Sequence, residues 1–551
     1  MDRPWLNAYP QGVPADIPTP EFRSIREMIE HAFREYADRP AYSNMGSTLT
    51  YRDLDELSMQ FARYLQNTLG LTRGERVAIM LPNLLQYPVA LCGAFRAGLV
   101  VVNVNPLYTA RELRHQLADS GARAIVILEN FAHVLQEVIG DTQVEHVVTT
   151  GLGDLLRWPA RPITNFVVRY VKRAVPRYSL PGSVSFANAL RRGKHGELRH
   201  IELGFADIAF LQYTGGTTGV SKGAMLSHRN MVHNVFQTEA WTGGTFDDIE
   251  RNVAITALPL YHIFSLKSNC LLMMWLGGEN VLITNPRDAA GFVRELGKHR
   301  FTYVTGVNTM FATLLNTPGF AELDFSALRL TIGGGMAVQE AIAREWQAVT
   351  GKPIVQAYGL TETSPAATIN PLDSAGFNGS IGLPIPSTAV RICDDDGKDT
   401  ELGEICIRGP QVMEGYWRNQ EETQKVMLRG GWFRTGDIGR MDEQGFVYIE
   451  DRKKDMILVS GFNVYPNEIE GIVVEMDGVL EAAAIGIPDE KSGEAIKLFV
   501  VRGNSAVTED DVLAHCRASL TRYKMPQAVE FRDELPKTNV GKILRRALRD
   551  E

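Results

Sequence analysis

Cysteine is scarce in this sequence, and its few occurrences form no pattern. Five cysteines occur in 551 residues, with no C-x-x-C pair and no group of histidines beside them. Zinc sites and disulfide frameworks need cysteines at short, regular spacings. We therefore expect reduced thiols in a protein that stays in the cytoplasm. The five are Cys92, Cys270, Cys393, Cys406 and Cys516.

Targeting signals, long apolar runs and an excess of basic residues are also missing. The first residues lack the apolar core of a signal peptide, and no uninterrupted apolar run is long enough to span a bilayer. The 57 Lys and Arg are outnumbered by 65 Asp and Glu, so the formal net charge is −8. A general nucleic-acid binder carries a basic surface, so we expect no nucleic-acid partner.

Helix and strand patterns alternate in the first part of the chain. Thr50 and Asp53 have the spacing of a helix-capping box, and helical periodicity follows them. Segments 77–81, 99–104 and 124–128 are apolar and of strand length, with helical patterns between them. This order is typical of the α/β class, in which a mostly parallel sheet is covered by helices.

A charged stretch at 451–455 is the best candidate for a domain boundary. Beyond it, residues 467–475 and 509–520 have helical patterns, whereas 480–487 and 496–501 have strand patterns. These elements fit a small α+β domain that follows the larger α/β part.

The glycine- and threonine-rich loop 213–223 is the strongest local signal. Its glycines allow tight turns that point several N–H groups at one anion, and Lys222 adds a positive charge, so the loop suits the triphosphate of ATP. It is not a Walker A loop, because the lysine spacing differs and the flanks 208–212 and 223–226 look extended. A surface hairpin without a ligand is the alternative. The predicted phosphate-binding residues are Tyr213, Thr214, Gly215, Gly216, Thr217, Thr218, Gly219 and Lys222.

Further motifs follow the loop along the chain. They lie at 258–264, 333–336, 356–363, 431–438, 451–455, 461–466 and 536–542. On these motifs the sequence resembles the adenylate-forming enzyme superfamily, and most closely the bacterial long-chain fatty-acid–CoA ligases. The resemblance covers nearly the whole chain, and 431–470 resembles the signature of fatty-acyl-CoA ligases in particular. One such motif is weak evidence, but seven in the order of the family are specific.

The resemblance implies a two-step reaction. The carboxylate of a fatty acid attacks the α-phosphorus of ATP to give acyl-AMP and pyrophosphate, and the CoA thiol then displaces AMP to give acyl-CoA. The expected cofactors and co-substrates are therefore ATP, Mg²⁺ and coenzyme A, in fatty-acid degradation or lipid metabolism. Because the first step brings a carboxylate against a polyanion, it needs positioning and positive charge more than a protein nucleophile.

The resemblance also implies two domains. An N-terminal AMP-binding domain of helix-covered sheets with a β-rich subdomain is expected at 1–453, and a small mobile C-terminal α+β domain at 454–551. The hinge is expected near 451–456, with Lys454 as the pivot. Rotation about it would present Lys542 for adenylation and the face around Gly461 for CoA, since hinges absorb large φ/ψ changes at a few residues.

The family's functional residues fall on matching positions of this sequence. Glu362, together with Thr214, is expected to hold Mg²⁺ through oxygen ligands. Asp437 is expected to accept hydrogen bonds from the ribose hydroxyls, and Arg452 to contact the same sugar or a nearby phosphate. The expected adenine slot comprises Gly333, Gly334, Gly335, Gln356 and Tyr358, and Gly359 and Thr361 are further expected cofactor-binding residues.

Lys542 is the expected catalytic lysine, which stabilises the developing charge when the carboxylate attacks ATP. His262 resembles the gate between the acyl tunnel and the nucleotide. Outside their motifs, such residues would more often be a solvated lysine and a structural histidine. The complete predicted catalytic set is Lys542, His262, Thr214 and Lys222.

The substrate class is read from the position after His262. Amino-acid-activating relatives tend to carry Asp there, and Ile263 disfavours an amino-acid substrate. The apolar stretch 264–275 fits an acyl tunnel or a buried core helix equally well. Some long-chain relatives have a gating Trp where this chain has Leu266, so their gate is not transferred. Only nine residues follow Lys542, which disfavours a peptide-synthetase module with a carrier domain.

Three alternatives to a long-chain ligase stay open on the sequence. One is a ligase for aryl or medium-chain acids. Another is a non-catalytic nucleotide-binding regulator, against which the presence of Glu362, Asp437, Arg452 and Lys542 counts. The third is a Walker-type NTPase, which the loop spacing disfavours. The sequence does not determine the oligomeric state, and a homodimer is one option.

A basic segment at 158–178 interrupts the acidic average. It contains no Asp or Glu, and apolar residues recur at helical spacing among its arginines. A helix of this kind lies on an anionic membrane surface or packs on the protein with solvated arginines. The first option would give the enzyme a peripheral contact with the inner membrane. The basic residues are Arg161, Arg169, Lys172, Arg173 and Arg177, and the apolar ones are Ile163, Phe166, Val167, Tyr170 and Val171.

Overall fold

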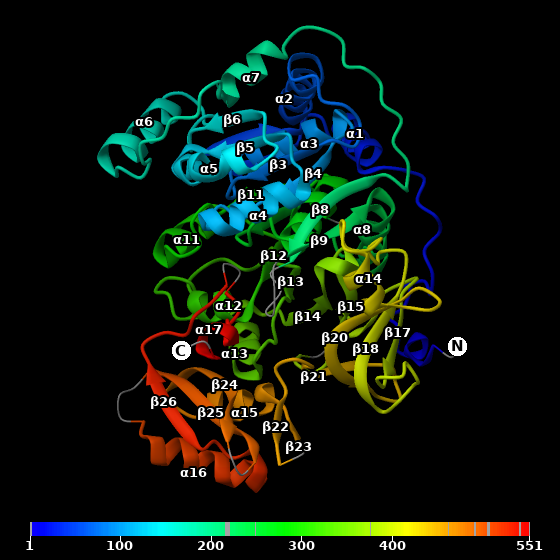
Figure 1. Ribbon diagram of the computed structural model, residues 1–551, viewed down its shortest axis with the longest axis vertical. Helices are drawn as coiled ribbons and strands as arrows, with labels where there is room; N and C mark the ends of the chain where they lie inside the picture. Colours follow the sequence, from blue (N-terminus) through cyan, green and yellow to red (C-terminus); the bar gives the residue numbers. More distant parts are fainter. Residues whose placement is uncertain are drawn as a thin grey trace.

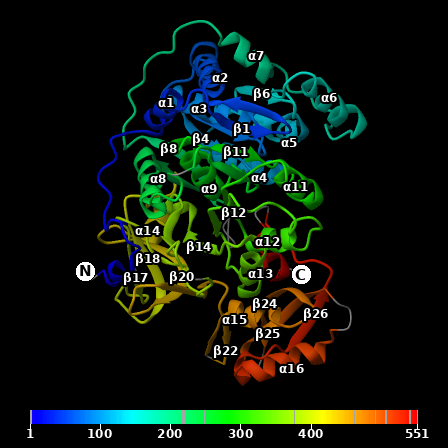
Figure 2. The same ribbon diagram turned by 180° about the vertical axis from the view of Figure 1, so that it is seen from behind.

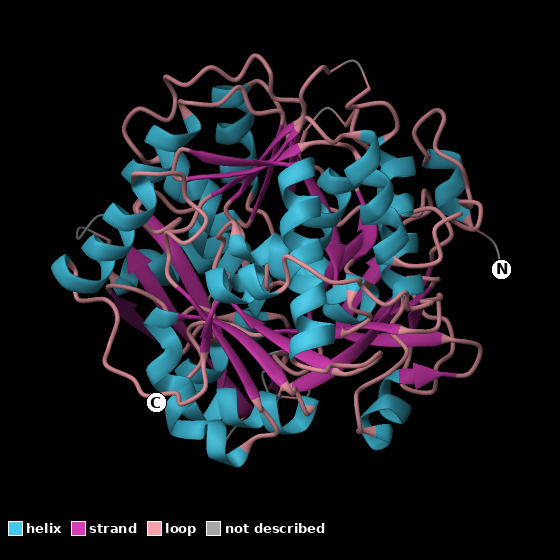
Figure 3. Ribbon diagram, turned by 90° about the horizontal axis from the view of Figure 1, so that it is seen from above, coloured by secondary structure: helices cyan, strands magenta, loops and turns pink. Residues whose placement is uncertain are grey.

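The computed structural model describes residues 3–214, 221–247, 249–374, 376–460, 462–489, 492–503, 507–538 and 541–549. Within these residues the chain forms four sheets with helices packed around them (Figures 1 and 3). Two large sheets occupy the upper and middle parts of Figure 1, and the C-terminal residues form a separate body at the bottom.

A seven-stranded sheet has the strand order β7-β6-β5-β3-β4-β8-β9. Its strands are parallel except for the antiparallel pair β8–β9. The strands predicted at 77–81, 99–104 and 124–128 are β3, β4 and β5, so the prediction of a mostly parallel sheet is confirmed. The strands are β3 Arg76–Met80, β4 Val100–Asn103, β5 Ala124–Leu128, β6 His146–Thr150, β7 Val184–Ser185, β8 Ile208–Thr214 and β9 Lys222–Ser227.

A nine-stranded sheet has the strand order β16-β15-β14-β13-β12-β10-β11-β1-β2. Its central strands are parallel, and antiparallel pairs occur only at its two ends. The strands are β1 Pro40–Asn44, β2 Ser47–Thr50, β10 Val253–Thr256, β11 Glu279–Leu282, β12 Tyr303–Gly306, β13 Leu330–Gly333, β14 Ile354–Gly359, β15 Ala366–Ile369 and β16 Leu383–Pro384.

Helices cover both sheets and share a large apolar core with them. The predicted capping box is present at the start of α2, where Thr50 Oγ1 accepts a hydrogen bond from the Asp53 N–H at 3.1 Å. The main helices are α1 Ile25–Glu35, α2 Tyr51–Arg63, α3 Gln86–Arg96, α4 Ala110–Ser120, α5 Ala132–Val138, α7 Phe186–Arg192, α8 His228–Thr242, α11 Ala289–Leu296, α12 Asn308–Leu315 and α13 Glu340–Thr350.

A five-stranded antiparallel sheet forms the expected β-rich subdomain. Its strand order is β17-β18-β20-β19, with β21 paired to β20. Its inner face joins the same core as the two larger sheets. The elements are β17 Ala389–Cys393, β18 Leu402–Arg408, α14 Gln420–Val426, β19 Met427–Leu428, β20 Trp432–Met441 and β21 Val447–Arg452.

The C-terminal residues build the fourth sheet around apolar cores of their own. The predicted helices 467–475 and 509–520 are α15 and α16, and the predicted strands 480–487 and 496–501 are β24 and β25, so an α+β unit is confirmed. The elements are β22 Ile457–Val459, β23 Phe462–Val464, α15 Pro466–Val474, β24 Val479–Asp489, β25 Gly493–Arg502, α16 Glu509–Ser519, β26 Ala528–Arg532 and α17 Arg545–Arg549. The boundary at 453/454 stays a prediction.

The basic segment is helical, as predicted, and lies at the outer edge of the molecule. It comprises α6 Ala160–Phe166 and a wider helical turn, η5 Val167–Val171. Both views from the side place α6 at the periphery, away from the C-terminal body (Figures 1 and 2). Across the described parts of the chain, no helix combines the length and apolar character needed to cross a membrane.

Candidate active site

The phosphate loop connects two paired strands, as predicted. β8 ends at Thr214 and β9 begins at Lys222, and these two residues are opposite each other in the antiparallel pair. The flanks are therefore extended, which a Walker A loop with its following helix would not be. The five central residues of the prediction lie outside the described residues. These are Gly215, Gly216, Thr217, Thr218 and Gly219.

The two ends of the loop are anchored from α4. The Tyr213 hydroxyl donates a 2.5 Å hydrogen bond to Asp119 Oδ2, and His115 Nε2 lies 2.9 Å from the carbonyl oxygen of Ser221. Burial, and then the Asp119 charge, raise the pKa of Tyr213, so its hydroxyl stays protonated. A Cβ at Gly223 would lie 3.1 Å from the Tyr213 ring, so a side chain there would crowd this anchor. Nucleotide contact by Tyr213 stays a prediction.

Lys222 and Glu362 are connected through a residue that the sequence did not single out, Tyr416. Lys222 forms an ion pair with Glu422, and its Nζ lies 5.2 Å from the centroid of the Tyr416 ring. The Tyr416 hydroxyl donates a 2.8 Å hydrogen bond to Glu362 Oε1. The cation predicted to meet the triphosphate thus already has a carboxylate partner. The Lys222 contact, the largest of its causes, lowers the pKa of Glu422 to about 2.

Glu362 offers a single buried carboxylate beside the end of the phosphate loop. It is 8% exposed, and burial raises the pKa of its carboxyl. In the described part of the chain, no three His, Cys, Asp or Glu side chains gather as metal ligands. An ion here would therefore be shared between few protein oxygens and the phosphates of a nucleotide. That arrangement is typical of Mg²⁺ and unlike a dedicated protein cage.

The glycine run at the end of β13 is required by packing. A Cβ at Gly333 would lie 2.6 Å from a side-chain carbon of the neighbouring strand β14, and one at Gly334 would lie 2.9 Å from the carbonyl oxygen of Ala357. Gly335 has a φ of +78°, which disfavours other residues. Gln356 pairs with Gly333 across the two strands and is buried. These glycines therefore bring β13 close to β14, a constraint that the prediction of an adenine slot did not include.

The segment after Tyr358 turns sharply toward Glu362. A Cβ at Gly359 would lie 1.7 Å from the carbonyl oxygen of Pro365, so only glycine fits. Thr361 begins the short helical turn Thr361–Thr363 (η7), which carries Glu362. The motif 356–363 thus places Tyr358, Thr361 and Glu362 where β14 of the nine-stranded sheet ends and the chain turns toward β15.

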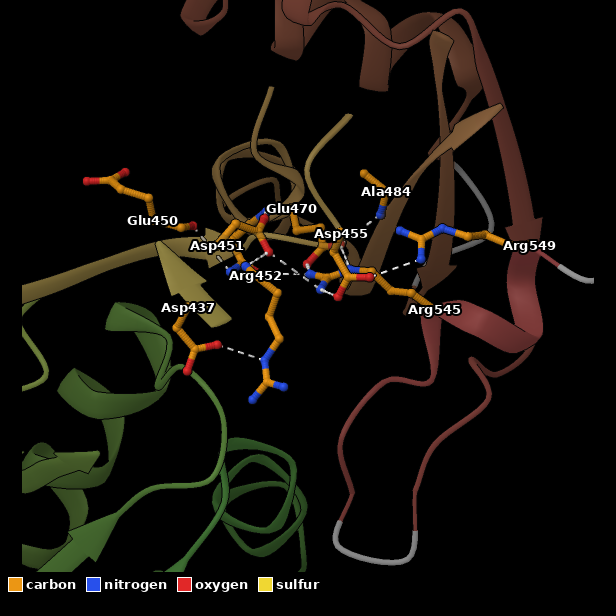
Figure 4. A network of polar contacts seen from close by, with 10 residues as sticks. Asp437, Glu450, Asp451, Arg452, Asp455, Glu470, Ala484, Arg545 and Arg549 are labelled. Atoms are coloured by element: carbon orange, nitrogen blue, oxygen red, sulfur yellow. Dashed lines mark hydrogen bonds and ion pairs between the residues drawn. The ribbon is translucent and has the colours of Figure 1, made fainter. Parts of the chain in front are cut away.

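Asp437 is held by two other predicted site residues. The Tyr358 hydroxyl donates a 2.6 Å hydrogen bond to Asp437 Oδ2. Arg452 Nε lies 2.9 Å from Oδ1 as an ion pair (Figure 4). Burial, and then the Asp437 charge, raise the pKa of Tyr358 well above its usual value. Asp437 is 1% exposed, and the Arg452 guanidinium is the ion-pair partner of its Oδ1, although no hydrogen bond of good geometry to that oxygen occurs among the described residues. Acceptance of ribose hydroxyls by this carboxylate stays a prediction.

Lys542 reaches this site from the C-terminal residues. A Cβ at the preceding Gly541 would lie 2.5 Å from Thr309 Oγ1 at the start of α12, so the turn that carries the lysine touches the large part of the molecule. Burial, and then the charge of Arg452, lower the pKa of Lys542 to about 8. Burial, and then the charge of Lys542, lower the pKa of His262 to about 4. The predicted lysine and histidine therefore lie within electrostatic range of each other.

His262 precedes the apolar stretch 264–275. Its Nδ1 lies 3.4 Å from the Phe264 N–H, which assigns Nδ1 as the acceptor. The stretch is helical, and most of its apolar side chains belong to the main core. An acyl tunnel along it stays a prediction. Lys267 is buried within the stretch and donates a 2.6 Å hydrogen bond to Thr238. No acyl-tunnel residues are assigned.

The predicted pivot and CoA face are less defined. Lys454 is exposed in the turn 453–455 between β21 and β22. Gly461 lies outside the described residues.

Tyr416 and Glu422 were missed because no spacing or charge pattern marks them. Their position depends on a bridge between Ala224 and Tyr416, far apart in sequence.

Comparison with known proteins gives matches along nearly the whole chain. A family profile described as "AMP-binding enzyme" matches residues 29–417, and one described as "AMP-binding enzyme C-terminal domain" matches 468–542. A long-chain-fatty-acid–CoA ligase of Yersinia pestis is 57% identical over 554 residues, covering 100% of this chain and 98% of that protein. MatB from Rhodopseudomonas palustris is 29% identical, and its ATP-bound and apo structures have TM-scores of 0.81 and 0.71. Both structural matches cover 95% of this chain and 98% of MatB.

Proposed function

Because this chain belongs to the AMP-binding enzyme family, we infer that it is an AMP-forming long-chain fatty-acid–CoA ligase. ATP and a fatty acid give acyl-AMP and pyrophosphate, and CoA then gives acyl-CoA and AMP. The observation that supports the site assignment is the convergence of His262, Asp437, Arg452 and Lys542, which come from four separate motifs. Such a site supplies positive charge and positioning without a protein nucleophile.

The direct test is a substrate series with pyrophosphate and acyl-CoA as separate readouts. Palmitate should release pyrophosphate without CoA and give acyl-CoA with it. Octanoate and 4-coumarate should be poorer substrates, since the 57% identical relative is a long-chain enzyme. Equal or better rates with 4-coumarate would favour an aryl-acid ligase. No acyl-AMP from any carboxylate would favour a nucleotide-binding regulator.

In the first step, a carboxylate oxygen forms a bond to the α-phosphorus while the bond to pyrophosphate breaks. Lys542 stabilises the charge that builds on the α-phosphate, and with a pKa of about 8 it is largely protonated at neutral pH. Asp437 positions the nucleotide by accepting from the ribose at Oδ1. In the second step, the CoA sulfur bonds to the acyl carbon, the thiol proton is lost, and AMP leaves.

Mg²⁺ fits the oxygen donors of Glu362 and Thr214. When bound, it would neutralise phosphate charge and polarise the phosphoryl oxygens. Glu362 is kept in place by Tyr416, and the raised pKa of its carboxyl reflects burial that a cation would offset. Lys222 would exchange its ion pair with Glu422 for the phosphates when nucleotide binds.

The C-terminal residues rotate about Lys454 between the two steps. The arrangement described here, with Lys542 near His262, suits adenylation. The higher TM-score against ATP-bound MatB than against apo MatB supports a nucleotide-ready orientation. Rotation would withdraw Lys542 and bring the face around Gly461 to the acyl-AMP.

The enzyme acts in the cytoplasm and contacts the inner face of the membrane through α6 and η5. Their large apolar side chains point to solvent, which an ordinary packed helix would avoid. Phe166 and Tyr170 form a ring pair with centroids 5.2 Å apart. The exposed fractions are Trp158 85%, Ile163 57%, Phe166 57%, Tyr170 62% and Val171 65%.

The charges around this apolar face favour an anionic bilayer as the partner. Arg161, Lys172, Arg173 and Arg177 are exposed, and the segment has no acidic residue. Arg169 is less available, because its Nη2 lies 2.5 Å from Glu129. Fatty acids partition into bilayers, so this contact shortens the route of the substrate to the site.

Co-sedimentation with liposomes tests this contact. The double variant Lys172→Gln/Arg173→Gln should bind anionic liposomes roughly 5- to 25-fold more weakly, since each basic side chain near such a surface contributes about 1 kcal/mol. The loss should be greater at low salt. The variant Lys398→Gln/Arg429→Gln removes the same charge from the β-rich subdomain and should bind like wild type. Equal sedimentation of all three proteins would exclude this segment. A homodimer stays a separate prediction for light scattering.

A further inference from the structure

A buried carboxylate contacts the C-terminal body from the other side of the proposed hinge (Figure 4). Asp451 lies on β21, opposite Ile438 of β20, so it belongs to the β-rich subdomain. Its Oδ2 accepts a 2.8 Å hydrogen bond from the N–H of Asn467, at the start of α15. The side-chain amide of Asn467 donates at 3.3 Å to the carbonyl oxygen of Glu450. These bonds connect two elements that the turn 453–455 separates along the chain.

Arg545 is the cation at the centre of this contact. Its Nη2 donates at 2.6 Å both to Glu470 Oε2 and to Asn467 Oδ1, and its Nε donates at 3.0 Å to Glu470 Oε1. Its Nη1 lies 3.8 Å from Asp451 Oδ1 and 3.5 Å from Asp455 Oδ2. The guanidinium is only 13% exposed. It therefore bridges α15 of the C-terminal body to Asp451 of β21.

Arg545 lies three residues after Lys542, at the start of α17, and hydrogen bonds tie the chain between them to residues 536–538. Lys542 and Thr538 exchange two hydrogen bonds, of 2.7 and 3.1 Å. The Leu544 N–H donates at 2.8 Å to the Pro536 carbonyl. Fixing the guanidinium of Arg545 therefore also fixes the base of the turn that carries the catalytic lysine.

We propose that Asp451 and Arg545 are positioning residues that hold the C-terminal body in the orientation that presents Lys542 to the nucleotide. The proposal rests on the rotation about Lys454. That rotation separates Asp451 from Asn467 and Arg545, because the two partners move with α15 and α17 while Asp451 stays on β21. A buried carboxylate that loses its partners is costly. The contact thus biases the two-state equilibrium toward the adenylation orientation.

The test is to remove the charge of Asp451 and measure the two half-reactions separately. Asp451→Asn keeps the size and an oxygen acceptor, but loses the attraction for Arg545. Acyl-AMP formation should fall roughly 5- to 50-fold relative to wild type, which is the size of a typical conformational coupling. CoA transfer to preformed acyl-AMP should be unchanged or faster. A merely structural role would lower both rates together, and that result would overturn the proposal.

Two further variants keep the test decisive. Arg545→Lys retains the charge but loses the forked hydrogen bonds to Glu470 and Asn467. The ratio of acyl-AMP formation to CoA transfer should therefore fall, by a smaller factor than in Asp451→Asn. This variant provides the test if Asp451→Asn folds poorly. Glu468→Gln removes a carboxylate of the same helix α15 that pairs with Lys524 at 2.7 Å and, within the described residues, makes no hydrogen bond or ion pair with β21. Its ratio should equal that of wild type. An unchanged ratio in all variants would refute the inference, whereas wild-type enzyme that forms no acyl-AMP would instead refute the proposed function.

Discussion

The groups of the large part that we propose to face the nucleotide and the lysine of the C-terminal body are held in different ways. Glu362 and Asp437 are fixed inside the large part by hydrogen bonds from Tyr416 and Tyr358, of 2.8 and 2.6 Å. Lys542 instead comes from a body with its own apolar core and meets the large part across a turn. The comparison teaches that the groups proposed to hold the nucleotide and its metal are fixed within one part of the molecule, whereas the proposed catalytic lysine comes from the part that we propose to rotate.

Removing the side chain of Lys542, which the C-terminal body supplies, should have the largest effect on activity. Lys542→Ala should lower acyl-AMP formation by about 10²- to 10³-fold, the usual cost of losing one preorganised charge-stabilising donor. CoA transfer to preformed acyl-AMP should be largely spared. Pyrophosphate release and acyl-CoA formation from synthetic acyl-AMP are the two assays. An equal loss in both would mean that Lys542 is structural.

Changing Glu362, which is fixed within the large part, should instead affect the Mg²⁺ requirement. Glu362→Gln should raise the Mg²⁺ concentration for half-maximal adenylation by roughly 10- to 100-fold, because a carboxylate ligand is lost. Tyr416→Phe, which removes only the supporting hydrogen bond, should give a smaller shift in the same direction. A Mg²⁺ titration of pyrophosphate release measures both. An unchanged curve for Glu362→Gln would show that another group holds the ion.

Blocking the rotation of the C-terminal body should slow CoA transfer more than adenylation, which is the opposite of the effect expected for Lys542→Ala. Lys454→Pro fixes φ at the proposed pivot and should slow CoA transfer by roughly 30-fold while adenylation falls less. Lys454→Ala, which leaves φ free, is the matched control and should transfer normally. Wild-type turnover of the proline variant would place the pivot elsewhere.

The smallest expected effect is on pH dependence. Burial lowers the pKa of Lys542 to about 8, and its charged form is the active one, so kcat/KM for adenylation should fall as pH rises through 8. The protonated fraction drops roughly eightfold between pH 7.5 and 9. His262, with a pKa of about 4, stays neutral over this range and adds no transition. A flat profile up to pH 9.5 would mean that the charge of Lys542 does not limit the step.

Much of the fold was predictable because local patterns determine it, whereas the site residues were predicted from the resemblance of their motifs. The capping box at Thr50, the apolar strands and the loop between β8 and β9 depend on neighbours in sequence. Glu362, Asp437 and Lys542 were predicted as site residues because their motifs resemble those of the family. The packing reason for Gly333 was not visible, since it depends on the approach of β14.

The residues that escaped prediction act through contacts between distant segments. Tyr416 reaches Glu362 only because the segment around it is bridged to Ala224. No predicted role falls on Arg545, yet its side chain is only 13% exposed and lies among Glu470, Asp451 and Asp455. No spacing pattern in a single sequence indicates a contact between residues so far apart in the chain.

A single-turnover experiment on the wild-type enzyme tests most directly whether one site carries out two separable steps. Enzyme is mixed with ATP, Mg²⁺ and radiolabelled palmitate without CoA. One portion is quenched at successive times, and a second, unquenched portion is chased with CoA and excess unlabelled palmitate. The two-step mechanism predicts that acyl-AMP and pyrophosphate accumulate together up to one equivalent per enzyme, and that the labelled acyl group passes to CoA without dilution by fresh unlabelled palmitate. Acyl-CoA that forms only from free palmitate, with no acyl-AMP in the first phase, would contradict it.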